Sequence, residues 1–161
     1  MEFKIKLIEN HDVQDVLHLV RTVFDQFEAP DYSSEGVAEF YKYIQVDAMA
    51  SRISKNHFGL LALKNSDILG MIEIRDFEHI SLLFVDSDFQ GQGIGKKLWI
   101  ETCKKCIKSK GEVGSFTVNS SPFAVPIYEK LGFRKVSEEQ SINGIRFYPM
   151  LLRDSTMVSF E

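Results

Sequence analysis

The sequence lacks a long apolar run, and its first residues lack the apolar core of a secretion signal. The longest apolar stretch, residues 58–63, has six residues, far short of the ~20 that a membrane-spanning helix needs. The first six residues alternate charged and apolar side chains, unlike a secretion signal. We therefore expect a cytoplasmic protein with no membrane partner.

A basic tract is also missing. Lys and Arg total 19 against 23 Asp and Glu, which gives a net charge of −4. Proteins that bind nucleic acid without sequence preference depend on clustered cations that contact phosphates. The composition therefore argues against a nucleic-acid partner, whereas it is compatible with a cationic substrate.

Cysteine is scarce, with only Cys103 and Cys106 in the chain. A structural zinc site needs four ligands, and the sequence offers no second pair at a suitable spacing. A redox C-x-x-C pair lies at the start of a helix, whereas these residues fall in the middle of an expected one. We interpret both as packing residues of a protein in a reducing compartment, and we expect no metal.

The remaining composition is that of a globular domain. The chain has 161 residues, of which 44% are hydrophobic and 26% charged, and single domains commonly have ~100–200 residues. We expect one domain over residues 1–161, with its core at about 3–152 and a tail at 153–161.

Hydrophobic periodicity predicts alternating groups of helices and strands. Strands are expected at residues 3–7, 57–64, 68–75, 79–85, 115–118, 133–136 and 145–152, the last two joined as a hairpin around Asn143-Gly144. Helices are expected at about 12–27 and 34–44, with 47–54 as an extension, and at 96–110 and 122–131. This order predicts a mixed α/β sheet with helices on both faces.

A glycine-rich turn, residues 90–95, lies between an apolar strand and a helix. Glycine permits positive φ and close approach of a ligand, and the start of a helix attracts phosphate. A tight turn without a ligand is the alternative. The dinucleotide fingerprint fails because Lys96 occupies its last glycine position, and the nucleotide phosphate loop fails at Gln90 and Lys97.

The same turn resembles the acyl-CoA loop of the GNAT N-acetyltransferase superfamily, (Gln/Arg)-x-x-Gly-x-(Gly/Ala), which Gln90, Gly93 and Gly95 match. Residues 80–85 look like the family's central strand, and residues 119–133 resemble its second conserved block. The resemblance covers about residues 3–152. It implies a GNAT-like mixed, mostly antiparallel twisted central sheet with helices on both faces.

The resemblance implies acetyl-CoA, or coenzyme A, as co-substrate, with its pyrophosphate on the loop and its pantetheine arm along the preceding strand. Asn119 is expected beside that arm, although a role as a turn residue is equally compatible with the sequence. The implied cofactor-binding residues are Leu83, Phe84, Val85, Gln90, Gly91, Gln92, Gly93, Ile94, Gly95, Lys96 and Asn119.

Two residues are expected to carry the chemistry that the resemblance implies. Tyr128 corresponds to the family's general acid, which protonates the departing thiolate; the alternative is a tyrosine packed in the core. Glu73, on the strand beside the central one, is the candidate general base; the alternative is a solvated carboxylate. His79 and Ser81 are further candidates near the same strand edge.

The expected function is transfer of an acetyl group to a primary amine by direct attack in a ternary complex. The acceptor is open between a small-molecule amine and a protein amino group, and Glu28, Asp31 and Tyr32 are expected to line its binding site. A homodimer is left open. The alternative function is a non-catalytic acyl-CoA-binding regulatory or sensor module.

Overall fold

The computed structural model describes residues 1–111 and 114–153, so residues 154–161 of the expected tail lie outside the described part. The strands are β1 (Lys4–Leu7), β2 (His57–Lys64), β3 (Asp67–Arg75), β4 (His79–Val85), β5 (Ser115–Ser120), β6 (Arg134–Lys135), β7 (Gln140–Ile142) and β8 (Ile145–Arg153). The α-helices are α1 (Val13–Phe27), α2 (Ser34–Tyr43), α3 (Val46–Ile53), α4 (Ile94–Lys110) and α5 (Val125–Lys130). None of these helices is both long and apolar enough to cross a bilayer.

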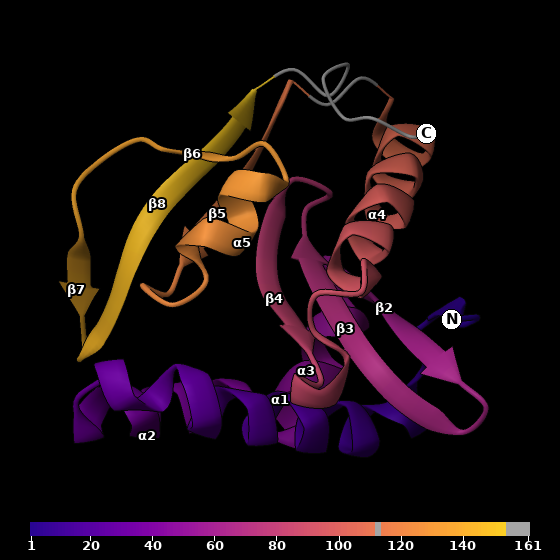
Figure 1. Cartoon of the computed structure of the whole chain (residues 1–161), viewed down its shortest axis with the longest axis horizontal. Coiled ribbons are helices and arrows are strands. Elements are labelled where there is room, and N and C mark those ends of the chain that lie inside the picture. Colours follow the sequence, from indigo (N-terminus) through magenta and orange to yellow (C-terminus); the bar gives the residue numbers. More distant parts are fainter. Residues whose placement is uncertain (112–113, 154–161) are drawn as a thin grey trace.

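The strands form one sheet in the order β1-β2-β3-β4-β5-β8-β6, with β7 paired to β8 (Figure 1). Among the described strands, β4 and β5 pair in parallel and all other pairs are antiparallel. The predicted mixed and mostly antiparallel sheet is therefore confirmed.

Helices cover both faces of this sheet, as predicted. On one face, Val16, Val20 and Phe24 of α1 pack with Met71 of β3 and Phe84 of β4. Their spacing of four residues puts the α1 side chains on one stripe. On the other face, the core contains α4, α5 and the opposite side of the strands; its α4 members are Ile94, Leu98, Trp99, Cys103 and Cys106.

Strands β4 and β5 separate soon after they meet. They pair only at His79–Thr117 and Ile80–Val118, whereas β4 continues along β3 and β5 continues along β8. Figure 1 shows the two strands diverging, with α5 close to the opening. The β3–β4 register skips Ser81, so this residue is a β-bulge, which locally bends a strand.

The structure corrects three details of the sequence prediction. The turn Asn143-Gly144 joins β8 to β7, whereas β6 pairs with the far end of β8. Residues 46–53 form a separate helix, because Ile44 and Gln45 leave the helical conformation. The helix expected at 122–131 begins at Val125, with a proline at the start where no N–H is needed.

Candidate active site

The glycine turn leads directly into α4. Gly93 is the residue before the helix and has φ of 86°, a left-handed conformation that favours glycine. A Cβ atom built at Gly93 would have no neighbour within 4 Å, so the turn is open on that side. The unpaired N–H groups of the first helical turn provide an anion-binding position there.

A cavity of about 470 Å³ lies along β4, this turn, α4 and α5. Nine of the expected cofactor-binding residues line it: Leu83, Phe84, Val85, Gln90, Gly91, Gly93, Ile94, Gly95 and Lys96. Gln92 does not line it; its side-chain amide instead contacts the Asp88 carbonyl oxygen at 3.5 Å. Phe123, Ile127 and Lys130 also line the cavity. They lie within residues 119–133, the block that resembles the family's second conserved segment, but they were not among the expected cofactor-binding residues.

Part of the β4 backbone beside this cavity does not pair with β3. The Asp86 N–H donates to the Leu69 carbonyl of the preceding hairpin at 2.8 Å. Because bonded and non-bonded pairs alternate along an antiparallel ladder, Leu83 and Val85 direct their backbone groups away from β3. That is the side from which β5 has diverged. The Gln90 side-chain amide donates to the Val85 carbonyl at 3.1 Å.

A second cavity, of about 280 Å³, lies across the same opening. Glu28, Tyr32, Ser81 and Asn119 line it. Glu28 and Tyr32 were expected in the acceptor site, Asn119 beside the cofactor, and Ser81 at the strand edge. Asp31, also expected in the acceptor site, lines neither cavity. The α2 residues that line the second cavity were not expected: Glu39, Phe40 and Tyr43. Phe40 has the helical hydrophobic spacing of a core residue, and no sequence signal marked Glu39 or Tyr43.

The two cavities meet at residues that line both: Glu28, Leu83, Phe84, Ala124 and Tyr128. Tyr128 is 5% exposed. Burial, with a further contribution from Glu28, raises the pKa of its phenol well above the usual range. The hydroxyl therefore stays protonated at neutral pH, at the junction of the two cavities.

Glu28 follows the last residue of α1 and lines both cavities. Burial raises the pKa of its carboxyl group to about 7, although hydrogen bonding by Ser121 favours the charged form. A carboxyl group with this pKa can take up a proton and release it near neutral pH.

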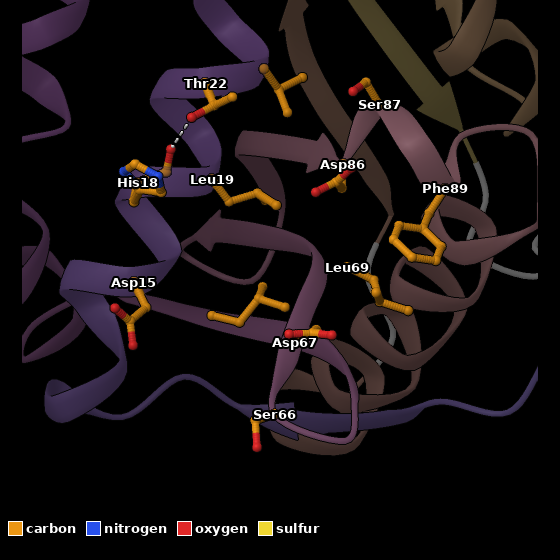
Figure 2. A pocket seen from close by; sticks show the side chains of 12 residues that line it. Asp15, His18, Leu19, Thr22, Ser66, Asp67, Leu69, Asp86, Ser87 and Phe89 are labelled. Carbon is orange, nitrogen blue, oxygen red and sulfur yellow. Dashed lines mark hydrogen bonds between the residues drawn. The ribbon is translucent and has the colours of Figure 1, made fainter.

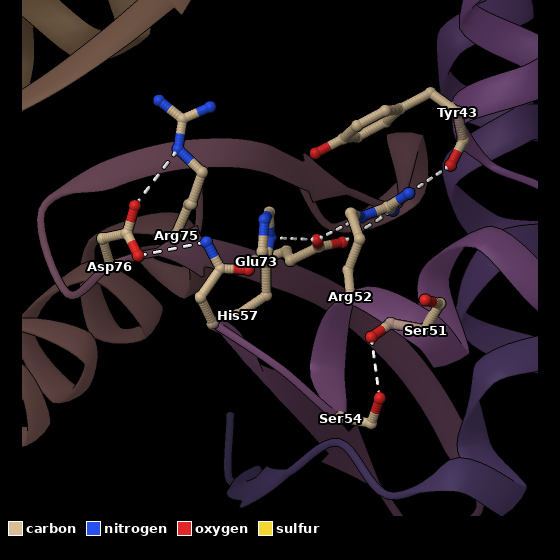
Figure 3. Close-up of polar contacts among 9 residues, drawn as sticks. Tyr43, Ser51, Arg52, Ser54, His57, Glu73, Arg75 and Asp76 are labelled. Carbon is tan, nitrogen blue, oxygen red and sulfur yellow. Dashed lines mark hydrogen bonds and ion pairs between the residues drawn. The ribbon is translucent and has the colours of Figure 1, made fainter.

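Glu73 lines neither cavity. Its side chain is fully buried, so the alternative of a solvated carboxylate is wrong. The Arg52 guanidinium binds both carboxylate oxygens, from Nε at 2.7 Å and from Nη2 at 3.0 Å. His57 Nδ1 lies 2.6 Å from the same carboxylate (Figure 3).

His79 lies at the start of β4 and also lines neither cavity. Its Nδ1 atom is 2.7 Å from Thr117 Oγ1 on β5. Burial, reinforced by the positive charge of Arg75, lowers the pKa of the imidazole to about 4. The ring is therefore neutral at pH 7.

The two cysteines are fully buried in the core, as expected for packing residues. Burial raises the pKa of both thiols, that of Cys106 to about 12. Among residues 1–111 and 114–153, no group of three or more His, Cys, Asp or Glu side chains is arranged to hold a metal ion.

A third cavity, of about 460 Å³, lies between α1 and the turn that joins β2 to β3 (Figure 2). Three carboxylates line it, those of Asp15, Asp67 and Asp86. None of the residues to which the sequence analysis assigned chemistry lines this cavity. The candidate active site is therefore at the opening between β4 and β5.

Comparison with known proteins shows that the fold is shared. The structure is similar to PaiA N-acetyltransferase of Thermoplasma acidophilum, which was crystallised with coenzyme A; the TM-score is 0.79 at 18% identity, over 95% of this chain and 99% of that one. A GCN5-related N-acetyltransferase of Rhodopseudomonas palustris also gives a TM-score of 0.79, at 22% identity, over 95% and 96% of the two chains.

The sequence is 41% identical over 56 residues to glucosamine 6-phosphate N-acetyltransferase of Trypanosoma brucei brucei. This match spans 35% of this chain and only 37% of that enzyme's length. The model of the acetyltransferase (GNAT) domain family matches residues 28–153, which include both cavities except for Val23. The chain therefore belongs to the GNAT acetyltransferase family.

Proposed function

We propose that this protein transfers the acetyl group of acetyl-CoA to a primary amine by direct attack in a ternary complex. The observation that carries this proposal is the meeting of two cavities at Tyr128, with the glycine turn in one of them. A ternary mechanism needs two substrate positions that share one reacting centre, because nucleophile and thioester must come within about 3–3.5 Å.

Coenzyme A occupies the cavity of the glycine turn in this proposal. The N–H groups at the start of α4 hold its pyrophosphate, and Lys96 and Lys130 add positive charge. The pantetheine arm pairs with the backbone of Leu83 and Val85, which face away from β3. The Val85 N–H donates to the thioester oxygen, where a well-aimed donor contributes about 3–4 kcal/mol to transition-state stabilisation.

The reaction begins when the neutral amine attacks the thioester carbon and forms the new C–N bond. The carbonyl then re-forms as the C–S bond breaks, and the departing sulfur takes the proton of the Tyr128 hydroxyl. The nitrogen of the new amide loses a proton, and a proton from solvent restores the Tyr128 hydroxyl. Burial raises the pKa of this phenol, but it also disfavours a charged thiolate in the same position. Proton donation as the C–S bond breaks therefore lowers the barrier.

Glu28 accepts the proton that the amine loses, directly or through water. A primary amine has a pKa near 10.4, so it is mostly protonated at pH 7 and needs a base. Glu28 lines both cavities and has a pKa of about 7. Glu73, the base expected from the resemblance, has both oxygens bound to Arg52 instead.

The acceptor in this proposal is a cationic amine without a phosphate group. The amine occupies the second cavity, hereafter the acceptor cavity. Among the described residues that line it, Glu28 and Glu39 are acidic and none is Lys, Arg or His. Glu39 also pairs with Lys42 at 3.3 Å, but Lys42 does not line the cavity. A phosphate would therefore meet carboxylates and no cation, which disfavours the acceptor of the trypanosomal relative.

The test is an acceptor panel with acetyl-CoA, monitored by release of free thiol and by mass of the product. The panel contains 1,5-diaminopentane, glucosamine, glucosamine 6-phosphate and a peptide with a free N-terminal alanine. We expect turnover of the diamine or the peptide, and at least tenfold higher kcat/KM for glucosamine than for its 6-phosphate. Binding of acetyl-CoA without turnover of any amine would instead support the sensor module.

A further inference from the structure

The buried carboxylate of Glu73 is part of an ion pair that the proposed mechanism does not use. Arg52 comes from α3 and Glu73 from β3, and their side chains are 14% and 0% exposed. Arg52 bonds both carboxylate oxygens, a bidentate arrangement that fixes the orientation of the guanidinium plane. A fixed plane can in turn orient the groups that contact it.

One such group is Tyr43, the last residue of α2. The remaining Arg52 nitrogen, Nη1, donates to the Tyr43 carbonyl at 2.6 Å. The guanidinium carbon also lies 3.7 Å from the centroid of the Tyr43 ring, within the range of a cation–π contact. Figure 3 shows Tyr43 extending over the pair from the end of its helix.

Tyr43 lines the acceptor cavity together with Phe40 and Glu39 of the same helix. The Arg52–Glu73 pair is therefore a connection from this wall to β3, the strand that pairs with β4. In the proposed function, the thioester of acetyl-CoA lies beside β4. The position of the acceptor wall relative to the thioester thus depends on an ion pair outside both cavities.

We propose that Arg52 is a positioning residue for the amine acceptor, and that Glu73 serves to hold Arg52 rather than to take the proton. The proposal rests on the proposed function for its kinetic readout. If it holds, loss of either partner weakens acceptor binding and leaves acetyl-CoA binding intact, because neither side chain lines the coenzyme A cavity.

The experiment compares Arg52→Met, Glu73→Gln and the double variant with the wild type. The amine is the one in the panel that the wild type turns over fastest. Each single variant should raise acceptor KM about tenfold, at neutral and at high pH, with acetyl-CoA Kd unchanged. The double variant should raise acceptor KM by about the same factor as either single variant, since the two residues act as a unit. It also leaves no buried charge unpaired within the pair, which protects folding.

Two further variants separate positioning from general structural support. Arg52→Lys keeps the charge but not the bidentate plane, so it should recover stability without restoring acceptor KM. Arg21→Met removes a similar arginine over the Tyr41 ring, at 4.1 Å. Because Tyr41 does not line the acceptor cavity, this variant should keep acceptor KM within twofold of wild type.

Hydrogen exchange gives a readout that needs no acceptor. In the acetyl-CoA complex, Arg52→Met should speed amide exchange in residues 40–46 and leave the peptide of α4 unchanged. Wild-type exchange in residues 40–46, or wild-type acceptor KM in Arg52→Met, would overturn the proposal. So would a pure kcat defect in Glu73→Gln that disappears at high pH. If no amine is turned over, the proposed function fails, and exchange alone decides the role of Arg52.

Discussion

His79 Nδ1 and Thr117 Oγ1 lie 2.7 Å apart and connect β4 to β5 at the first of the two residue pairs that these strands share. One pair later the strands diverge, and the two candidate substrate cavities occupy the opening. The hydrogen bond therefore lies where the candidate active site begins, and it can oppose further separation of the strands.

Thr117→Val should test this connection, because valine keeps the shape of threonine and removes the hydroxyl. We expect the free energy of unfolding to fall by about 1 kcal/mol, the usual net value of one hydrogen bond. Urea unfolding followed by circular dichroism measures this change. Thr22→Val is a suitable control, since the Thr22 hydroxyl donates to the His18 carbonyl one turn earlier, on the exposed side of α1. An unchanged midpoint in Thr117→Val would show that the contact contributes nothing.

The low pKa of His79 should make stability depend on pH. The folded pKa is about 4, whereas the unfolded value is about 6.5. As pH falls from about 6.5 to about 4, the unfolded chain takes up a proton that the folded protein does not, so the free energy of unfolding decreases. His79→Gln should flatten this part of the profile. Equal slopes in variant and wild type would contradict the prediction.

Gly93→Val should abolish acetyl-CoA binding while the protein stays folded. The left-handed φ of 86° costs a β-branched residue about 1–3 kcal/mol, and the side chain would occupy the open side of the turn. Gly111→Val is the matched control at the other end of α4, where φ is also positive and no atom is near. Gly111→Val should lower the free energy of unfolding and leave acetyl-CoA affinity unchanged. Calorimetric titration with acetyl-CoA distinguishes the two; equal affinity in both variants would make the turn purely structural.

Tyr128→Phe should lower kcat about 10²–10³-fold, the scale of a lost general acid. Acetyl-CoA Kd should stay nearly unchanged, because the ring keeps its edge contact with Phe133. The defect should be smaller for an acyl donor with a more acidic thiol, which needs less protonation. Tyr148→Phe, on β8 and outside both cavities, provides the control. Full turnover by Tyr128→Phe, with chemistry rate-limiting, would mean that the tyrosine only packs.

Glu28→Gln should lower kcat about 10²–10³-fold at pH 7. The decrease in kcat should be smaller at high pH, where the amine deprotonates without a base. The wild-type rate should rise with pH through about 7, where Glu28 becomes charged and able to accept a proton. Glu35→Gln, an exposed residue of α2, should behave as wild type. A rate profile that is identical in wild type and Glu28→Gln would exclude Glu28 as the base.

The sequence by itself determined those elements that are specified by residues close together in the chain. The stripe of α1, the apolar run of β4 and the turn at residues 90–95 each depend on neighbours within a few positions, so periodicity and glycine spacing were sufficient. The motif also led to Tyr128, because the family block that contains it is contiguous in the chain. Nine of the expected cofactor residues line one cavity for the same reason.

Only the tertiary structure decided what surrounds the carboxylates. Glu73 was expected to be a base because it lies on the strand beside β4, but its partner Arg52 is 21 residues away and on another layer. Glu28 had no motif. Burial raises the pKa of its carboxyl group, and its hydrogen-bonding partner Ser121 is distant in the sequence. The second cavity likewise joins Tyr43 of α2 to Ile145 of β8. Hydrophobic patterns specify which face of an element is buried, whereas the partners of a buried polar group depend on how the layers pack together.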